Sequence, residues 1–208
     1  MFTLHLETIE QIKSVIIPEI KGAAEESLRA YEQGAREDGG NNFDNYTLGC
    51  TCWSSLYNRL DRKLTQHPFF SKETYKKILT ITCPNGDDLL KFYVSRVDEK
   101  GRVPRAGKSI KMQLREQAFL STEIQSIIAR SGSSVFMIGY DISHLKGLGK
   151  ITFDMLSMID RKHFQSDTLY VFEGDDHIIP AHHTPQEEIK RPTVIREILA
   201  NQQKKATR

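Results

Sequence analysis

Apolar residues recur at helical spacing near the N-terminus of the chain. Residues 7 to about 33 are predicted to form a helix, because isoleucines at helical intervals precede a run of good helix formers. Pro18 lacks a backbone N–H and should kink or split this helix. The isoleucines concerned are Ile9, Ile12, Ile16, Ile17 and Ile20.

Three further segments have the pattern of amphipathic helices. The first follows residue 50 and places five apolar side chains on one face, which we expect to dock on the core. A middle helix is predicted from about Ser109 to Arg130, and a short C-terminal helix over residues 193–208. The five apolar residues of the first segment are Trp53, Leu56, Tyr57, Leu60 and Leu64.

Runs of β-branched and aromatic residues predict two hairpins and one more strand. The first hairpin joins Lys76–Cys83 to Leu89–Val97 across a Pro-Asn-Gly-Asp-Asp turn. The second joins residues 134–142 to 149–158, and the further strand covers Asp167–Glu173. Hairpins separated by helices indicate an α+β fold with a mostly antiparallel sheet and helices at the N-terminus, in the middle and at the C-terminus.

We expect residues 1–208 to form a single domain, because no repeat and no long linker divides the chain. Gly, Asn and Asp gather near residues 34–45, where we expect a mobile loop. Two internal prolines and mixed charge near residues 174–192 predict an extended surface segment.

The composition is that of a globular protein, with 208 residues of which 38% are hydrophobic and 27% are charged. No window approaches the ~18 consecutive apolar residues of a membrane-spanning helix, and the N-terminus lacks the pattern of a secretory signal. Three cysteines leave at least one thiol unpaired, which favours a reducing compartment. We therefore expect a cytoplasmic protein with buried, inert thiols and no membrane partner.

Residues 96–115, called the basic connector below, are locally basic although the whole chain has a formal net charge of only +2. The connector contains glycine and proline, leads into the predicted middle helix, and favours phosphate binding. The leading hypothesis is a small intracellular regulatory or binding protein that contacts nucleic acid or an acidic partner. A solvated surface loop is the alternative reading of the same residues. The basic residues are Arg96, Lys100, Arg102, Arg105, Lys108, Lys111 and Arg115.

Part of the connector, RVPRAGKS, resembles the phosphate-binding loop of nucleotide triphosphatases. Gly107, Lys108 and Ser109 match the last three positions of that motif, whereas Arg102 stands where its first glycine is required. Asp141, at the end of an apolar strand, is a candidate metal contact. A nucleotide-binding protein with a degenerate phosphate loop is therefore a second hypothesis.

An acidic and histidine-rich segment supports a third hypothesis, a metal-dependent nuclease or phosphodiesterase. Carboxylates would hold magnesium and a lysine would orient the attacking water, and no other cofactor is expected. The histidines fit no standard metal spacing, and an exposed polar loop is the alternative. The sequence leaves open whether the chain is an enzyme. The candidate catalytic residues are Asp175, Asp176, Glu188 and Lys190, and the weak metal candidates are His177, His182 and His183.

Aromatic and asparagine residues are dense between residues 41 and 60. Asn45, Tyr46 and Trp53 could form a recognition surface, whereas aromatic residues at helical spacing more often face a core. Asp44, Asn45 or Thr47 could equally cap the helix that follows.

Overall fold

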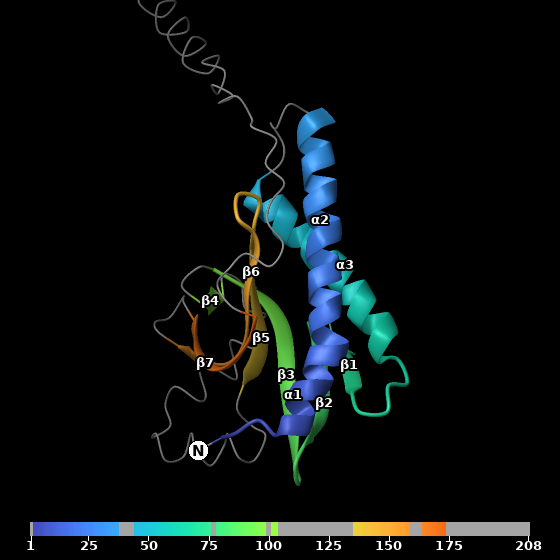
Figure 1. Cartoon of the computed structure of the whole chain (residues 1–208), viewed down its shortest axis with the longest axis vertical. Helices are drawn as coiled ribbons and strands as arrows, with labels where there is room; N and C mark the ends of the chain where they lie inside the picture. Colours follow the sequence, from blue (N-terminus) through green and yellow to red (C-terminus); the bar gives the residue numbers. More distant parts are fainter. Residues whose placement is uncertain are drawn as a thin grey trace, which may run out of the picture.

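The computed structural model describes residues 2–37, 44–75, 78–98, 101–103, 135–158 and 164–173, which form helices packed against one β-sheet (Figure 1). The α+β class is confirmed. The helical elements are α1 (Leu6–Gln11), the π-helical turn η1 (Ile12–Ile16), α2 (Ile17–Glu37) and α3 (Asn45–Leu64). The strands are β1 (Ser71–Tyr75), β2 (Ile78–Asn85), β3 (Asp88–Val97), β4 (Arg102–Val103), β5 (Phe136–Ser143), β6 (Gly147–Met158) and β7 (Phe164–Glu173).

The N-terminal helix accommodates Pro18 by a local change of hydrogen bonding. The turn η1 immediately precedes this proline, and the Ile17 N–H bonds the Ile12 carbonyl, five residues earlier. The helix then continues to Glu37, so the prediction of a loop near 34–45 is wrong for residues 34–37. Buried Ala35 and a 3.0 Å hydrogen bond from Gln33 to Glu37 favour helix at this end.

Helix α3 begins at an N-cap and buries every fourth residue. The Asp44 carboxylate accepts a 2.8 Å hydrogen bond from the Thr47 N–H. Trp53 and Tyr57, predicted on the core face, lie half-buried beside it, because residues one position earlier occupy the line that faces the sheet. The core-facing residues are Leu48, Cys52, Leu56, Leu60 and Leu64.

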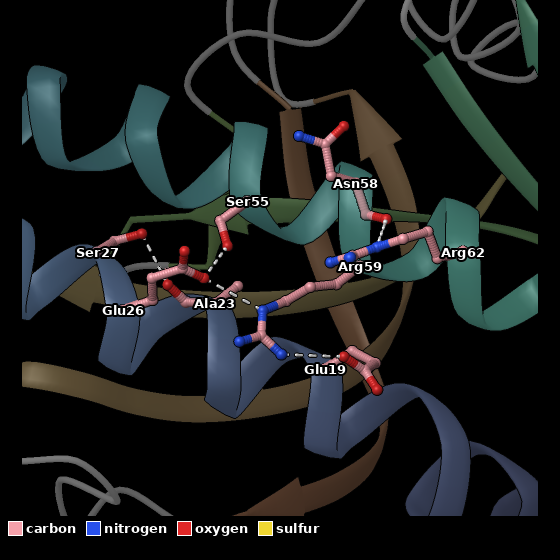
Figure 2. A network of polar contacts seen from close by, with 8 residues as sticks. All are labelled: Glu19, Ala23, Glu26, Ser27, Ser55, Asn58, Arg59 and Arg62. Atoms are coloured by element: carbon pink, nitrogen blue, oxygen red, sulfur yellow. Dashed lines mark hydrogen bonds and ion pairs between the residues drawn. The ribbon is translucent and has the colours of Figure 1, made fainter.

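A polar network joins α2 to α3 on the side away from the sheet (Figure 2). The Arg59 guanidinium donates 3.3 Å hydrogen bonds to both Glu19 and Glu26 of α2. Ser55 adds a 2.6 Å bond to the same Glu26 carboxylate. These contacts fix the relative position of the two helices, which Figure 1 shows crossing on one side of the sheet.

Within the described residues, the sheet has seven strands in the order β1-β2-β3-β5-β6-β7-β4. Both predicted hairpins are present, as β2–β3 and β5–β6. However, β3 and β5 pair in parallel, so the sheet is mixed and the prediction of a mostly antiparallel sheet made of two hairpins and one strand is wrong. The helices predicted over about 109–130 and 193–208, and the extended segment over 174–192, lie outside the described residues.

The sheet curls between β3 and β4. These strands lie four positions apart in the sheet, which would separate them by about 19 Å if the sheet were flat. The Gly101 N–H nevertheless donates a 2.8 Å hydrogen bond to the Asp98 carbonyl, so the start of β4 lies next to the end of β3. Val103 of β4 consequently packs in one cluster with Tyr93 and Val97 of β3. The curl encloses a second, smaller core.

The main core lies between the helices and the other face of the sheet. Phe153 of β6 packs against Phe92 and Phe136, each with ring centroids 5.8 Å apart. Phe2 stacks on Phe136 at 4.4 Å and ties the N-terminal residues to this layer. Among the helices that the structure describes, none combines the length and apolarity needed to cross a membrane.

Candidate functional site

The basic connector begins where two parallel strands end. Arg96 of β3 pairs with Tyr140 of β5, and Val97 pairs with Asp141, so the two strands finish at the same end of the sheet. The first turns of α3 reach this end as well, because Gly49 lies against the Arg96 side chain. Three elements thus meet around the first residue of the connector.

Arg96 is held by backbone groups of two other elements. Its Nη2 atom donates a 2.7 Å hydrogen bond to the Ile142 carbonyl at the end of β5. A Cβ atom at Gly49 would overlap its Nη1 atom, so the close approach to α3 depends on glycine at that position. The side chain is half-buried. Arg96 therefore anchors the connector on the folded body, and part of its hydrogen-bonding capacity is used within the protein.

Two buried polar side chains lie next to this anchor. Burial raises the pKa of the Cys52 thiol to about 11, while its neighbours Tyr140, Ser27 and Arg96 oppose the rise. Burial also raises the pKa of the Tyr140 hydroxyl, which has the Cys52 thiol as a neighbour. Both groups are thus neutral at physiological pH. The expectation of buried thiols is confirmed for Cys52 and for Cys83, whose pKa burial raises to about 12, whereas Cys50 is exposed.

The side of α3 that faces away from α2 carries aromatic residues. Tyr46, Cys50, Trp53 and Tyr57 follow one another at intervals of three or four residues, and we call them the α3 flank. Tyr46 is 56% exposed, and Trp53 and Tyr57 are half-buried with their rings edge to face at 6.0 Å. Tyr46, Cys50 and Trp53 lie within about one helical turn of Gly49, which contacts the Arg96 side chain, whereas Tyr57 lies about two turns further along α3.

The connector is also fixed at a second point, on the far edge of the sheet. Arg102 pairs with Gln165 of β7, and Ser166 donates a 3.1 Å backbone hydrogen bond to the Gly101 carbonyl. Gly101 has a φ of +70°, which glycine tolerates and most other residues do not. The remaining basic candidates Lys100, Arg105, Lys108, Lys111 and Arg115 lie outside the described residues, as do Gly107 and Ser109.

A buried carboxylate occupies the inner face of the curled sheet. Asp154 of β6 is fully buried, and its Oδ2 accepts a 2.6 Å hydrogen bond from Thr152, whereas its Oδ1 meets the distance and angle criteria for a hydrogen bond with no described residue. Gly139 makes room for it, because a Cβ atom there would lie 2.7 Å from Oδ2. Burial raises the pKa of Asp154. The hydroxyls of Thr152 and Thr168 and the positive charge of Lys150 lower it, but burial is the larger effect. Sequence reasoning missed this residue, although an acid among alternating apolar positions was a visible signal.

The acidic and histidine-rich candidates all fall outside the residues that the structure describes. Asp175, Asp176, Glu188 and Lys190 thus remain predicted catalytic residues, and His177, His182 and His183 remain predicted metal ligands. Within the part of the chain that is described, no three His, Cys, Asp or Glu side chains are grouped so as to hold a metal ion.

Comparisons of this chain with protein-family models, with curated proteins and with solved structures found no match.

Proposed function

We propose that this chain binds nucleic acid through the basic connector. The observation that carries the proposal is the concentration of charge, since residues 96–115 hold seven basic and two acidic residues in a chain whose formal net charge is +2. The rest of the chain is therefore net acidic. A polyanion would be attracted to the connector and repelled elsewhere, which favours one orientation on the phosphate backbone.

The fixed start of the connector supports this proposal. The Arg96 side chain is anchored at Ile142 and Gly49, β3 is paired with β5, and β4 is paired with β7, so the described residues before and after residues 99–100 are held by hydrogen bonds. A basic segment that starts from a rigid frame loses less conformational entropy on binding than one attached to a loose tail.

The test is a titration of fluorescently labelled single-stranded and duplex oligonucleotides, followed by anisotropy at two salt concentrations. With about six phosphate contacts, affinity should fall by about a thousandfold between ~50 and ~200 mM salt. Arg105→Glu combined with Lys108→Glu should weaken binding and reduce the salt dependence. Arg29→Glu combined with Lys91→Glu changes the charge equally at exposed positions outside the connector, and should have a much smaller effect.

The same titration separates nucleic acid from other partners. No detectable binding to either oligonucleotide at ~50 mM salt, where phosphate contacts are strong, would overturn the proposal. Binding to an acidic polypeptide such as polyglutamate, without binding to oligonucleotides, would assign the connector to an acidic protein partner instead.

A further inference from the structure

We infer that Asp154 is a pH-sensitive switch inside the smaller core, and that loss of its proton separates β4 from β7 while the helices stay packed on the sheet. Strand β4 lies within the basic connector, so this opening would release the second fixed point of that segment. The opening requires no nucleic acid, and its test is therefore independent of the proposed function. The smaller core consists of Tyr93, Val97, Val103, Val135, Met137 and Leu156.

The Asp154 carboxyl lies inside the smaller core and not at its surface. Asp154 is fully buried and pairs across the strands with Met137 of that core. Its Oδ2 atom, the Met137 Cε atom and the Val97 Cγ1 atom all lie within 3.2 Å of the point where a Cβ atom at Gly139 would stand. The carboxyl therefore shares one small space with two apolar side chains, and that space exists because position 139 has no side chain.

Hydrogen bonding gives the ionised form of Asp154 little support. Thr152 donates a 2.6 Å hydrogen bond to Oδ2, whereas Oδ1 meets the distance and angle criteria for a hydrogen bond with no described residue. The Thr168 hydroxyl on β7 is a further neighbour that lowers the pKa. A carboxylate among apolar groups needs several donors to replace its lost hydration, so the protonated form fits this site better.

Neighbouring charges do not reverse this preference. The strands around the carboxyl contribute the titratable residues Tyr93 from β3, Asp141 from β5, Lys150 from β6 and Asp167 from β7. Lys150 lowers the pKa of Asp154 and Asp167 raises it, while burial has the largest effect and raises it. Asp154 should therefore have a higher pKa in the closed form than in a form that exposes it to water.

Strand β4 is the part of the smaller core that separates at the lowest cost. It is the shortest of the described strands, at 2 residues, and both pair with β7. The Ser166 N–H of β7 adds a 3.1 Å hydrogen bond to the Gly101 carbonyl. Val103 packs in one cluster with Val97, which borders the Asp154 carboxyl. Separation of β4 would thus bring water to the carboxylate while breaking few hydrogen bonds.

Raising the pH should increase the open population. In the open form Asp154 is solvated and has its ordinary pKa of about 3.9, whereas in the closed form its pKa is higher. Between these two values the closed form holds one more proton, so the ratio of open to closed molecules should rise by up to about tenfold per pH unit. Below the lower value both forms are protonated, and the ratio should be constant.

Native-state hydrogen exchange measures this opening in the wild-type chain. The Ser166 N–H reports on the separation of β4, and the N–H of buried Leu60 in α3 reports on the helical layer. Exchange is followed from about pH 4 upwards, near the ordinary pKa of an aspartate, and each rate is divided by the intrinsic rate at that pH. Protection of Ser166 should fall below that of Leu60 as the pH rises. A low concentration of urea should accelerate Ser166 less than Leu60, because a local opening exposes less surface than unfolding does.

Two variants assign the opening to Asp154. Asp154→Asn cannot ionise and should remove the pH dependence of the local opening, whereas Asp88→Asn removes an exposed acid near the β2–β3 turn and should keep it. Thr152→Val removes a donor that favours the ionised form and should move the pH window upwards.

Each contrary outcome identifies the step that fails. Equal protection and equal urea dependence of Ser166 and Leu60 at every pH would overturn the switch, because β4 would then separate only when the whole chain unfolds. A local opening whose pH dependence survives in Asp154→Asn would overturn the assignment to this carboxyl. If Asp154→Asn does not fold, an unmoved window in Thr152→Val would overturn it instead.

Discussion

The guanidinium of Arg59 lies over the backbone of Gly22, where a Cβ atom would come within 2.8 Å of Nη1. The absence of a side chain at this position of α2 lets one arginine of α3 reach both Glu19 and Glu26 (Figure 2). The atom in the way is the far end of a flexible side chain, so an alanine at position 22 would displace the arginine without disturbing either helix backbone.

Gly22 and Arg59 should therefore be energetically coupled. Arg59→Ala should lower the free energy of unfolding by about 1 kcal/mol in the wild-type protein, because it removes two partly exposed ion pairs and the packing of the arginine stem. In a Gly22→Ala background the same change should cost less than half as much. Urea unfolding of the four proteins measures the coupling.

The matched control for this cycle is Arg29→Ala. Arg29 pairs with Glu25 inside α2, and its effect should be the same with glycine or alanine at position 22. Equal effects of Arg59→Ala in both backgrounds would show that the contact over Gly22 does not position the arginine.

Gly49→Ala should have opposite effects on stability in the wild-type protein and in the Arg96→Ala variant. Alanine favours helix over glycine by up to about 1 kcal/mol, but here its Cβ would displace the half-buried Arg96 from the Ile142 carbonyl. We expect Gly49→Ala to destabilise the wild-type protein by about 1–2 kcal/mol and to stabilise the Arg96→Ala variant. Thermal unfolding of the four proteins tests this reversal. If Gly49→Ala destabilised both backgrounds, the alanine Cβ would clash with a group other than the Arg96 side chain.

The stability of the protein should depend on pH through Asp154. Burial holds the pKa of this carboxyl above its ordinary value, so the folded state binds its proton more tightly than the unfolded state does. The stabilising contribution is complete below the unfolded pKa of about 3.9 and is lost as the pH rises through the folded pKa. Free energies of unfolding measured in urea from pH 4 upwards should therefore fall more steeply for the wild type than for Asp154→Asn.

The exposed Asp88→Asn variant controls for the change in net charge and should keep the wild-type profile. Parallel pH profiles for the wild type and Asp154→Asn would mean that the Asp154 carboxyl has the same proton affinity in the folded and unfolded states.

The three thiols should differ sharply in reactivity. Cys50 is exposed, whereas Cys52 and Cys83 are buried with pKa values raised to about 11 and about 12. A thiolate-specific disulfide reagent at pH 8 should modify one cysteine per folded chain quickly, and all three after denaturation. Mass spectrometry of peptides identifies the fast site. Rapid modification at Cys52 would show that α3 opens from the sheet more readily than its buried residues indicate.

Local signals predicted the β2–β3 hairpin but not the parallel neighbour of β3. The hairpin depends on a short turn in which Gly86 has a φ of +66° between the paired residues Asn85 and Asp88, and these residue types are visible in sequence. The pairing of β3 with β5 joins Val94 to Ile138 and has no local signature. A clue was present in the consecutive buried apolar residues of each strand, Phe92–Val94 in β3 and Phe136–Ile138 in β5, because strands buried on both faces lack apolar–polar alternation.

The candidate site was likewise only partly predictable. Arg96 stood out by its charge, but its contact with Gly49 joins residues far apart in the chain. An isolated glycine inside an amphipathic helical pattern often marks a close packing contact, and Gly49 fits that rule. Trp53 was predicted on the core face of α3 but lies on its flank. The reason is that Leu48 and Cys52, which the predicted apolar face omitted, are buried and set the core face one position earlier.

The pairing of β3 with β5 and of β4 with β7 has a consequence for biosynthesis. Strand β3 pairs with β5, and Arg102 of β4 pairs with Gln165 of β7. During synthesis, β5 and β7 therefore emerge from the ribosome well after β3 and β4, the strands with which they pair. At about 5–20 residues per second, the wait lasts for seconds. During that interval the β2–β3 hairpin presents an unpaired apolar edge, with Phe92 and Val94 on one of its faces. A nascent chain stalled at this length would be a natural client for a chaperone that binds extended apolar segments.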